Sequence, residues 1–503
     1  MRVRVETLWL AGILLLAGAL RFTGLGQGIP YAVGVDEPEI VERAVNMMRS
    51  GEFNPRFFDY PGLYIYLQFG VAVLRFVTGA MSGLWATLDQ APTSEFYLWG
   101  RAVTALLGTA TVGLVILIAR RLGLLAAVAA GLFLALQPMH ARESHYVLTD
   151  VPMAFFVTLT LALTLRAGDR RTLGAYAWCG VAAGCAAATK YNGGIAMLLP
   201  LLALAMQHDH PRRFASAMVV VGAAGAAFLI AAPYTILDLP AFLNAFGTLS
   251  HMYAVGQPPP EPGWLIYLKH LRINLGWPGI IVAIASLGVA VVRTWQAPTS
   301  EKITWATASA FVVITFWLIA RQKLIFGRYL LSILPPLAVL MGGAVAWALA
   351  RLGGSRWTAS RQAIAAAALI LLIAYQPAAT AVGWARLNAR VSTEEQLYAW
   401  LVEHVPAGSR VAVETFAMRL PPDRWPSSNH PRLIERTADE YAADGYHFLL
   451  ASSQSFGPPL TNPRPDDATR AYRTLFDRLD LVTTLSPSKE HPGAEWRIYR
   501  LPR

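Results

Sequence analysis

Cysteine and charge are both scarce in this sequence. Its 503 residues include only two cysteines, Cys179 and Cys185, which lie in one apolar run and are typical of small packing residues rather than of a disulfide framework. Charged residues make up 15% of the chain and hydrophobic residues 55%, whereas soluble domains contain about 25% charged residues. Because the mean hydropathy is also high, at +0.42, the composition indicates an integral membrane protein.

Motifs of several common enzyme classes are absent as well. The sequence contains no phosphate-cradling P-loop, no nucleophile elbow and no zinc signature. His140 and His145 are off the i,i+4 spacing that places two ligands on one helix face, so we interpret them as histidines of the membrane interface. The spacing thus disfavours His140 and His145 as metal ligands, and the sequence identifies no cofactor. Binding of a divalent cation remains an alternative, which requires that Asp36, Glu37 and Asp150 converge in the fold.

The net positive charge is confined to the hydrophobic part of the chain. Residues 386–503 contain 15 Lys and Arg and 15 Asp and Glu, so the formal net charge of +11 falls on the preceding residues. A basic surplus within a hydrophobic region is typical of a membrane protein whose orientation is set by charge. It argues against nucleic acid as a partner.

Apolar runs of the length that a bilayer requires recur along the chain. We predict eleven transmembrane spans, which begin near Leu8, Tyr97, Leu122, Thr149, Leu173, Gly193, Phe214, Trp277, Ile303, Tyr329 and Ala363. The first run is expected to be retained rather than cleaved as a signal peptide, because no small-residue cleavage site follows it cleanly. The sequence therefore predicts an all-α polytopic membrane domain over residues 1–383.

Basic residues in the links between spans predict the orientation. Alternate links contain Arg120 and Arg121; Arg166, Arg170 and Arg171; Arg212 and Arg213; Arg293 and Lys302; and Arg351, Arg356 and Arg361. The positive-inside rule places these links and the N-terminus in the cytoplasm, and eleven crossings then place the C-terminus outside. If residues 61–79 also crossed, every link would reverse, so we expect this stretch to lie in the interface.

The chain changes character after Trp384. Residues 410–414, 447–450, 481–485 and 496–501 have the pattern of strands, and residues 394–405 and 472–479 that of helices. They predict a small extracytoplasmic α/β domain over residues 384–503, long enough to form its own core. No catalytic motif stands out in this domain, and we interpret it as structural or acceptor-facing.

Four groups of polar residues fall on the outer side under this topology. The outer loop of residues 21–96 contains Asp36 and Glu37, and the other groups are HARESHYVLTD (140–150), ATKYNGG (188–194) and RQKLIFGRYLLSILPP (321–336). Acids and bases that are distant in the sequence meet on this side, as an outward-facing active site requires.

Each group also has a structural interpretation. These interpretations are helix capping by Asp36 (with Glu39, and Gly51 as the stop) and by Asp150, snorkelling of Lys190, and pairing of Arg321, Lys323 and Arg328 with lipid phosphates. The local patterns alone leave both readings open.

The order of the motifs resembles a known family. The Asp-Glu pair is followed by DYPG, RAVTALLGTATVGLVILIARRLG, SHYVLTDVP, ATKYNGG and GRYLLSILPP. This series is similar to the polyprenyl-phosphate-sugar-dependent transferases of the GT-C fold. Their members include the dolichyl-phosphate-mannose protein mannosyltransferases and the aminoarabinose transferases that modify lipid A. The resemblance covers roughly residues 1–345.

The resemblance implies a role for individual residues. Asp36 matches the catalytic Asp of the first outer loop, with Glu37 beside it, and Asp150 matches the Asp of the TD motif. Lys190 matches a basic residue that contacts the donor phosphate in the aminoarabinose branch. That branch has a lysine where this chain has Tyr60, which argues against aminoarabinose as the sugar.

The chemistry of such a transfer is consistent with these residues. A sugar phosphodiester already carries a good leaving group, so one general base, Asp36, is sufficient, and cations must stabilise the released phosphate. We expect Lys190 and Arg328 to supply those cations, and a single attack to invert the anomeric carbon of the hexose or pentose. The expected substrate-binding residues are Lys190, Tyr191, Arg328, Tyr60, Arg142 and His145.

Two other functional classes are alternatives to a transferase for this sequence. A secondary transporter of a small polar or anionic solute also places ionisable residues among helices, but it usually keeps them near the midplane and shows internal repeats, and none is visible here. A catalytically inactive scaffold is disfavoured by the intact Asp-Glu pair. The sequence therefore predicts a transferase of the bacterial plasma membrane, whose partners are a lipid-linked sugar donor, membrane lipids and an acceptor that is a protein, lipid or glycan.

Overall fold

The structure is a computed structural model that describes residues 2–255, 259, 261–353, 357–414, 418–421 and 424–502. The chain divides into two compact units. The first consists of Met1–Phe22 and Glu39–Trp384, and the second of Thr23–Pro38 and Ala385–Arg503. Asp36 and Glu37 are therefore part of the second unit, together with the C-terminal domain.

The first unit is built from helices. They are α1 (Arg2–Phe22), α2 (Pro38–Ser50), α3 (Leu63–Met81), α4 (Ser94–Ala119), α5 (Leu124–Ala135), α6 (Pro138–Glu143), α7 (Asp150–Arg170), α8 (Leu173–Thr189), α9 (Leu198–Met206), α10 (Arg213–Ala231), α11 (Tyr234–Leu237), α12 (Leu239–Val255), α13 (Gly263–Gln296), α14 (Thr299–Ala320), α15 (Leu334–Gly353) and α16 (Ala359–Asn388). Short 3-10 helices cover Leu88–Gln90, Arg120–Leu122, Tyr191–Met197 and Gly327–Ser332.

Among the described residues, eight helical segments are long and apolar enough to cross a membrane. They are Leu63–Met81, Ser94–Leu122, Asp150–Arg170, Arg213–Ala231, Gly263–Gln296, Glu301–Ala320, Leu334–Gly353 and Ala359–His404, and shorter apolar helices cover Leu124–Ala135, Leu173–Thr189 and Tyr191–Met206. Every predicted span coincides with one of these segments or with α1, which confirms the all-α polytopic class. Because α3 also qualifies by length and composition, the number of crossings stays a prediction.

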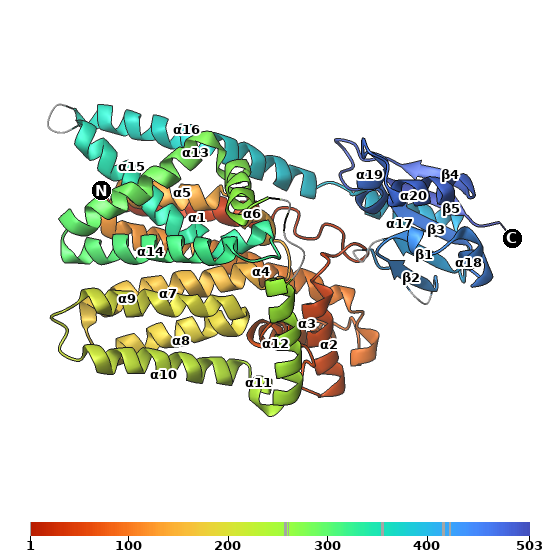
Figure 1. The fold of residues 1–503 in the computed structure, drawn as a ribbon, viewed down its shortest axis with the longest axis horizontal. Coiled ribbons are helices and arrows are strands. Elements are labelled where there is room, and N and C mark those ends of the chain that lie inside the picture. Colours follow the sequence, from red (N-terminus) through yellow and green to blue (C-terminus); the bar gives the residue numbers. More distant parts are fainter. Residues whose placement is uncertain are drawn as a thin grey trace. The chain divides into compact units, whose positions relative to one another are not determined.

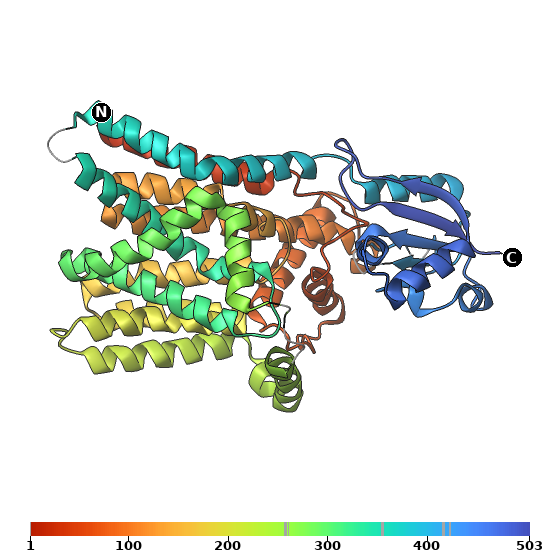
Figure 2. The ribbon, with the colours of Figure 1, turned by 45° about the horizontal axis from the view of Figure 1, so that its top comes forward.

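The long helices pack side by side through small residues. In Figures 1 and 2, α7, α8 and α10 lie next to one another, and Figure 1 shows α2, α3, α11 and α12 together at one end of the long helices. A Cβ atom at Gly180 or Gly184 of α8 would lie 2.4 Å and 2.3 Å from the carbonyl oxygens of Val220 and Ala224 in α10. Small residues permit this close approach, as is common between membrane helices.

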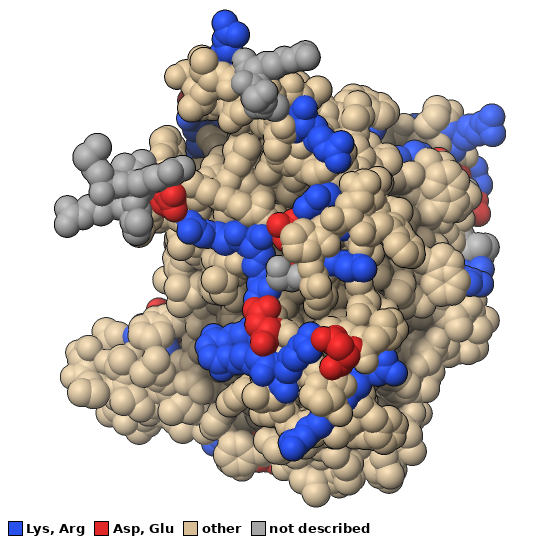
Figure 3. Space-filling view, turned by 90° about the vertical axis from the view of Figure 1, so that its left-hand side faces the viewer, with Lys and Arg blue, Asp and Glu red and all other residues tan. Residues whose placement is uncertain are grey.

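The opposite end of the bundle is rich in Lys and Arg. The links α4–α5, α7–α8, α9–α10 and α13–α14 meet there, and Figure 3 shows this face with many basic and few acidic side chains. Arg171 forms an ion pair with Asp209 (2.7 Å), and Arg293 one with Glu301 (2.6 Å). Arg356 of the predicted basic links lies outside the described residues.

A glycine divides α13 into two pieces. Gly276 has φ 70° and ψ 172°, so residues 263–275 and 277–296 form separate helices that meet at a kink. A Cβ atom in this left-handed region would be strained. The predicted span that begins near Trp277 starts directly after this break. The break leaves His270 and Asn274 on the piece before the kink.

The second unit contains a five-stranded sheet in the order β2-β1-β3-β5-β4. Its elements are α17 (Thr393–His404), β1 (Val411–Glu414), β2 (Ser427–His430), α18 (Ala438–Ala443), β3 (Phe448–Ser452), α19 (Ser453–Leu460), α20 (Asp467–Asp477), β4 (Asp480–Leu485) and β5 (Trp496–Arg500), with a 3-10 helix at Leu433–Glu435. Strands β2, β1 and β3 are parallel, and β5 is antiparallel to both β3 and β4.

Alternation along β1 fills a core on each side of the sheet. Val411 and Val413 pack in one cluster with Leu397 of α17, and Ala412 packs in the other with Tyr441 of α18. The α/β class that the sequence predicted for this region is confirmed. Strand β2 (Ser427–His430) was not predicted, because its four residues are polar and none of them is buried.

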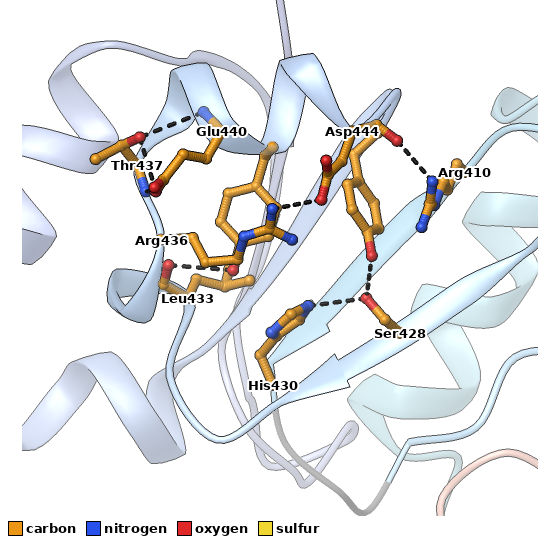
Figure 4. Close-up of polar contacts among 10 residues, drawn as sticks. Arg410, Ser428, His430, Leu433, Arg436, Thr437, Glu440 and Asp444 are labelled. Atoms are coloured by element: carbon orange, nitrogen blue, oxygen red, sulfur yellow. Dashed lines mark hydrogen bonds and ion pairs between the residues drawn. The ribbon is translucent and has the colours of Figure 1, made fainter.

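Polar contacts connect β2 and its neighbours to α18. Ser428 Oγ lies 2.8 Å from His430 Nε2 and 2.7 Å from the Tyr446 hydroxyl, and Arg436 pairs with Asp444 (Figure 4). Burial and the nearby Arg436 lower the pKa of His430, so its imidazole stays neutral near pH 7. These groups satisfy one another, which is consistent with a structural role for this part of the domain.

The segment Thr23–Pro38 packs against the C-terminal domain. Tyr31 stacks on Tyr398 with ring centroids 3.4 Å apart, and the Gly28 amide donates a hydrogen bond of 3.3 Å to Glu395. Ala32 forms an isolated antiparallel bridge with Met418. The C-terminal domain therefore holds the loop that carries the Asp-Glu pair.

Candidate active site

A buried carboxylate lies between two cations at the end of the bundle where α7 begins. Asp150 is 2% exposed, and its Oδ1 accepts a hydrogen bond of 2.6 Å from Lys190 Nζ. Its other oxygen lies 3.6 Å from Arg328 Nε. Buried charges are costly unless they are paired, and this arrangement pairs all three groups.

The local backbone explains how the three residues meet. Asp150 is the first residue of α7, and Lys190 follows the last residue of α8 with extended dihedrals, φ −153° and ψ 131°. The chain then turns tightly, since a Cβ atom at Gly193 would lie 2.3 Å from the carbonyl oxygen of Ala186. Arg328 comes from the 3-10 helix Gly327–Ser332, which precedes α15.

Lys190 is held within the protein rather than at its surface. It is 8% exposed, and its Nζ lies 4.8 Å from the ring centroid of Tyr329 and 5.9 Å from that of Tyr60. The Tyr329 hydroxyl is hydrogen-bonded to that of Tyr253 in α12. The ammonium therefore lies among phenol rings as well as beside Asp150, whereas a snorkelling lysine would expose its ammonium.

Tyr191 fixes the loop that precedes α3. Its hydroxyl donates a hydrogen bond of 2.8 Å to the carbonyl oxygen of Phe58, and its ring packs against Phe242 and Phe246 of α12. The structure thus brings the predicted residues Tyr60 and Tyr191 to the Asp150–Lys190–Arg328 cluster.

Arg142 and His145 lie at the end of the short helix α6. Arg142 donates hydrogen bonds of 3.0 Å and 2.7 Å to Glu143 Oε1, and its side chain is 49% exposed. The His145 ring meets the Trp384 ring edge to face, with centroids 4.4 Å apart. His140 and His145 are 0% and 2% exposed, so the expectation that they face the membrane interface is wrong.

The burial of His140 follows from an arginine in α1. Arg21 is fully buried, and its Nη2 lies 2.9 Å from His140 Nδ1. The guanidinium also donates to the carbonyl oxygens of Leu134 and Ala135 at the end of α5. These bonds hold α6 in position and leave His140 to a structural role.

A pocket of about 370 Å³ opens beside Arg328. Its polar lining residues are Arg142, Glu143, His270, Asn274 and Arg328, and Trp384 is among its apolar ones. All of these residues are in the first unit. The pocket therefore adjoins the Asp150 cluster through one shared side chain, Arg328.

Asp36 and Glu37 are described within the second unit. Glu37 is fully buried, and its Oε2 accepts a hydrogen bond of 2.6 Å from the Gly34 amide, whereas Asp36 is partly exposed. Helix α2 begins at Pro38, so both acids lie directly before its first residue, and capping by Asp36 stays a prediction. The predicted stop at Gly51, with φ 70°, follows the last residue of α2.

Several residues around the cluster were missed from the sequence. They are Tyr253, Glu143, His270, Asn274 and Trp384. Glu143 belongs to the polar group HARESHYVLTD but was not singled out within it, and for the other four the sequence pattern gave no functional signal. Asp59, between Phe58 and Tyr60, was also missed. Burial and the nearby Glu39 raise the pKa of the Asp59 carboxyl.

No group of three or more His, Cys, Asp and Glu residues that could hold a metal ion occurs in the part of the chain that the structure describes. The Asp150 carboxylate, the one predicted acid in the first unit, has both oxygens next to cations. Its surroundings are suited to anions rather than to a metal.

Comparison with solved structures identifies the class of the fold. The aminoarabinose transferase ArnT from Cupriavidus metallidurans, bound to undecaprenyl phosphate, is 16% identical with a TM-score of 0.57, and the match covers 99% of this chain and 98% of ArnT. The oligosaccharyltransferase of Archaeoglobus fulgidus is 13% identical with a TM-score of 0.60, over 90% of this chain and 70% of the other. The chain thus has the GT-C fold of membrane glycosyltransferases.

A family match narrows this class. Residues 54–250 match the model of the dolichyl-phosphate-mannose-protein mannosyltransferases, a range that includes Tyr60, Asp150 and Lys190. No curated protein matches the chain in sequence. The family resemblance that the ordered motifs predicted is confirmed, and nothing in these comparisons supports a transporter.

Proposed function

We propose that the protein transfers a hexose or pentose from a polyprenyl-phosphate donor to an acceptor outside the cytoplasm. The observation that supports this most is the buried cluster of Asp150, Lys190 and Arg328. Two cations around one carboxylate leave one positive charge at the end of the bundle. A donor phosphodiester carries one negative charge, so the cluster and the donor phosphate are matched in charge.

The names of the structural neighbours support the same donor class. ArnT was solved with undecaprenyl phosphate, and the archaeal oligosaccharyltransferase with a dolichol-phosphate. Lipids of this kind carry a phosphate at the membrane surface, where an ion cluster at a helix end can meet it. The phosphate group in this proposal lies against Lys190 and Arg328.

In the proposed reaction, the acceptor hydroxyl attacks the anomeric carbon while Asp36 accepts the hydroxyl proton. The bond between the anomeric carbon and the phosphate oxygen breaks, and polyprenyl phosphate leaves with the electron pair and one additional negative charge. Lys190 and Arg328 stabilise that charge as it develops, which is where catalysis gains most. One displacement inverts the anomeric centre.

Asp150 and Glu37 act on this step indirectly in the proposal. Asp150 holds Lys190 and Arg328 at a fixed separation by pairing with both. Glu37, through its bond to the Gly34 amide, fixes the turn that presents Asp36. Both are thus positioning residues around one base and two cations.

Transfer from labelled lipids tests this proposal. Purified protein in lipid nanodiscs is incubated with a panel of radiolabelled polyprenyl-phosphate sugars and with membrane extract as the acceptor source. At least one donor is expected to lose its sugar to a product that does not form with the Asp36→Asn variant. If no donor is consumed, or if the same product forms with the Asp36→Asn variant, the protein is not such a transferase with Asp36 as its base.

The proposed orientation has its own test. The basic end of the bundle is assigned to the cytoplasm and the C-terminal domain to the outside. A reporter fused after Arg503 is expected to be active only outside the cytoplasm, and one inserted in the link between α15 and α16 only inside. A cytoplasmic signal from the C-terminal fusion would contradict this orientation.

A further inference from the structure

The pocket beside Arg328 has the composition of a binding site for a small polar ligand. It measures about 370 Å³ and is formed by α6, α13, α16 and the segment that contains Phe326, Gly327 and Arg328. Ligand pockets in proteins measure roughly 300–1,000 Å³, so this one is at the lower end of the range. It suits one sugar ring better than an oligosaccharide or a lipid tail.

One part of the lining offers hydrogen bonds. Asn274 donates one N–H to the carbonyl oxygen of His270 at 2.8 Å, which leaves its own oxygen for a ligand, and Glu143 receives both bonds of Arg142 on Oε1 alone. An amide, a carboxylate oxygen and guanidinium groups can donate to and accept from neighbouring hydroxyls.

Another part of the lining is apolar. It consists of Pro138, Met139, Ile273, Phe326 and Trp384. The Trp384 ring packs edge to face against the His145 ring. An aromatic face next to hydrogen-bonding groups matches a sugar, which has a face of C–H bonds and a rim of hydroxyls.

The place of the pocket relative to the ion cluster fits the donor. Arg328 lines the pocket, and its Nε lies 3.6 Å from Asp150. Gly327 allows the close packing of His270, since a Cβ atom there would lie 3.0 Å from His270 Nδ1. In a lipid-phosphate sugar only one oxygen separates the phosphorus from the anomeric carbon. A phosphate at Arg328 would therefore direct the sugar into this pocket.

The charges of the lining restrict the sugar. The pocket contains Arg142 and Arg328 and one carboxylate, Glu143, which is already paired with Arg142. Arg328 is likewise paired, with Asp150 and in this proposal with the donor phosphate, so the charges of the site are already matched. The ammonium group of an amino sugar would add a positive charge that no further carboxylate of the lining offsets. Hydroxyl groups carry no such penalty.

We infer that this pocket binds the transferred sugar of the donor, and that this sugar is an uncharged hexose or pentose. The inference rests on the proposed function, because it takes the phosphate at Lys190 and Arg328 as given. It adds Asn274, Glu143 and Trp384 as residues that determine which donor is used.

Equilibrium binding to full-length protein in nanodiscs tests the inference. The probes are undecaprenyl phosphate alone and undecaprenyl phosphate carrying mannose, glucose, galactose, arabinose or aminoarabinose. At least one uncharged sugar is expected to bind the wild-type protein more tightly than the bare lipid, and aminoarabinose is not. If no uncharged sugar improves binding, or if aminoarabinose binds best, the inference is overturned.

Variants of the pocket separate the sugar from the phosphate. Asn274→Leu and Glu143→Gln are each expected to weaken binding of the best sugar lipid by about tenfold, the effect of one or two lost hydrogen bonds, and to leave the bare lipid unchanged. The control Asn46→Leu, at an exposed position of α2, should change neither affinity. Equal losses for both lipids, or none, would contradict a sugar site.

If the proposed function itself is wrong, the binding experiments should give a different set of results. In that case the wild-type protein binds neither the bare lipid nor any sugar lipid, and Lys190→Ala changes nothing. If the bare lipid binds and Lys190→Ala weakens it, the phosphate site stands, and only the behaviour of the pocket variants decides about the sugar.

Discussion

Asp36→Asn is expected to fold, to bind the donor lipid and to lose sugar transfer by about 10²–10⁴-fold, the usual effect of removing a positioned general base. An amide cannot accept the proton of the acceptor hydroxyl. Helix capping does not explain such a loss, because Asn caps a helix about as well as Asp. The measurement is the initial rate of transfer, with donor binding and thermal unfolding recorded on the same sample.

Two further variants define the result at Asp36. Asp36→Glu is expected to recover little, since the extra methylene displaces the carboxylate by about 1 Å and such a displacement can cost roughly 10²-fold. Glu52→Gln is the matched control, because Glu52 is exposed and forms only a surface ion pair with Arg56. Near-normal transfer by Asp36→Asn would mean that another group accepts the proton.

Lys190→Ala is expected to have the second large effect, a loss on the order of 2–4 kcal/mol of transition-state stabilisation if its ammonium contacts the phosphate. The measurement is kcat/KM for the donor. Arg328→Ala should act in the same direction. Lys323→Ala, which removes an exposed cation in the segment between α14 and α15, is the control and should change kcat/KM little.

The loss at Lys190 must be separated from a loss of folding. Without Lys190 the buried Asp150 carboxylate keeps only Arg328, and breaking a buried pair typically destabilises a protein by about 3–5 kcal/mol. The double variant Lys190→Met with Asp150→Asn removes both charges together, so it should regain stability without regaining donor use. If the double variant regains activity as well, the cluster is structural and the phosphate binds elsewhere.

The helices of the membrane domain could be predicted because each depends on a pattern within its own stretch of sequence. A run of apolar residues identifies a helix wherever it lies, and the basic links identify the ends that share a side. The start of the span near Trp277 was predicted for the same reason, but the helical piece of α13 before Gly276 was not, because its residues do not form a long apolar run. Strand β2 was not visible, because Ser427–His430 has neither apolar residues nor alternation.

The residues of the candidate active site could be predicted only in part. Asp150, Lys190 and Arg328 were expected together because the predicted topology places the ends of their helices on one side of the membrane. They stood out because they are charged residues in a hydrophobic part of the chain. The pocket residues His270, Asn274 and Trp384 could not be predicted from the sequence, since one polar or aromatic residue near a helix end has no periodic pattern.

The packing of Thr23–Pro38 with the C-terminal domain has a consequence for the order of events during synthesis. The Gly28 amide bonds to a residue 367 positions later in the chain. Ribosomes add roughly 5–20 residues per second, so the loop with Asp36 waits about 20–70 s for its partner. The membrane helices can all be inserted in that interval. Thr23–Pro38 therefore meets its packing partner late in synthesis, and a chain interrupted before α17 would contain Asp150, Lys190 and Arg328 but not the residues against which Thr23–Pro38 packs.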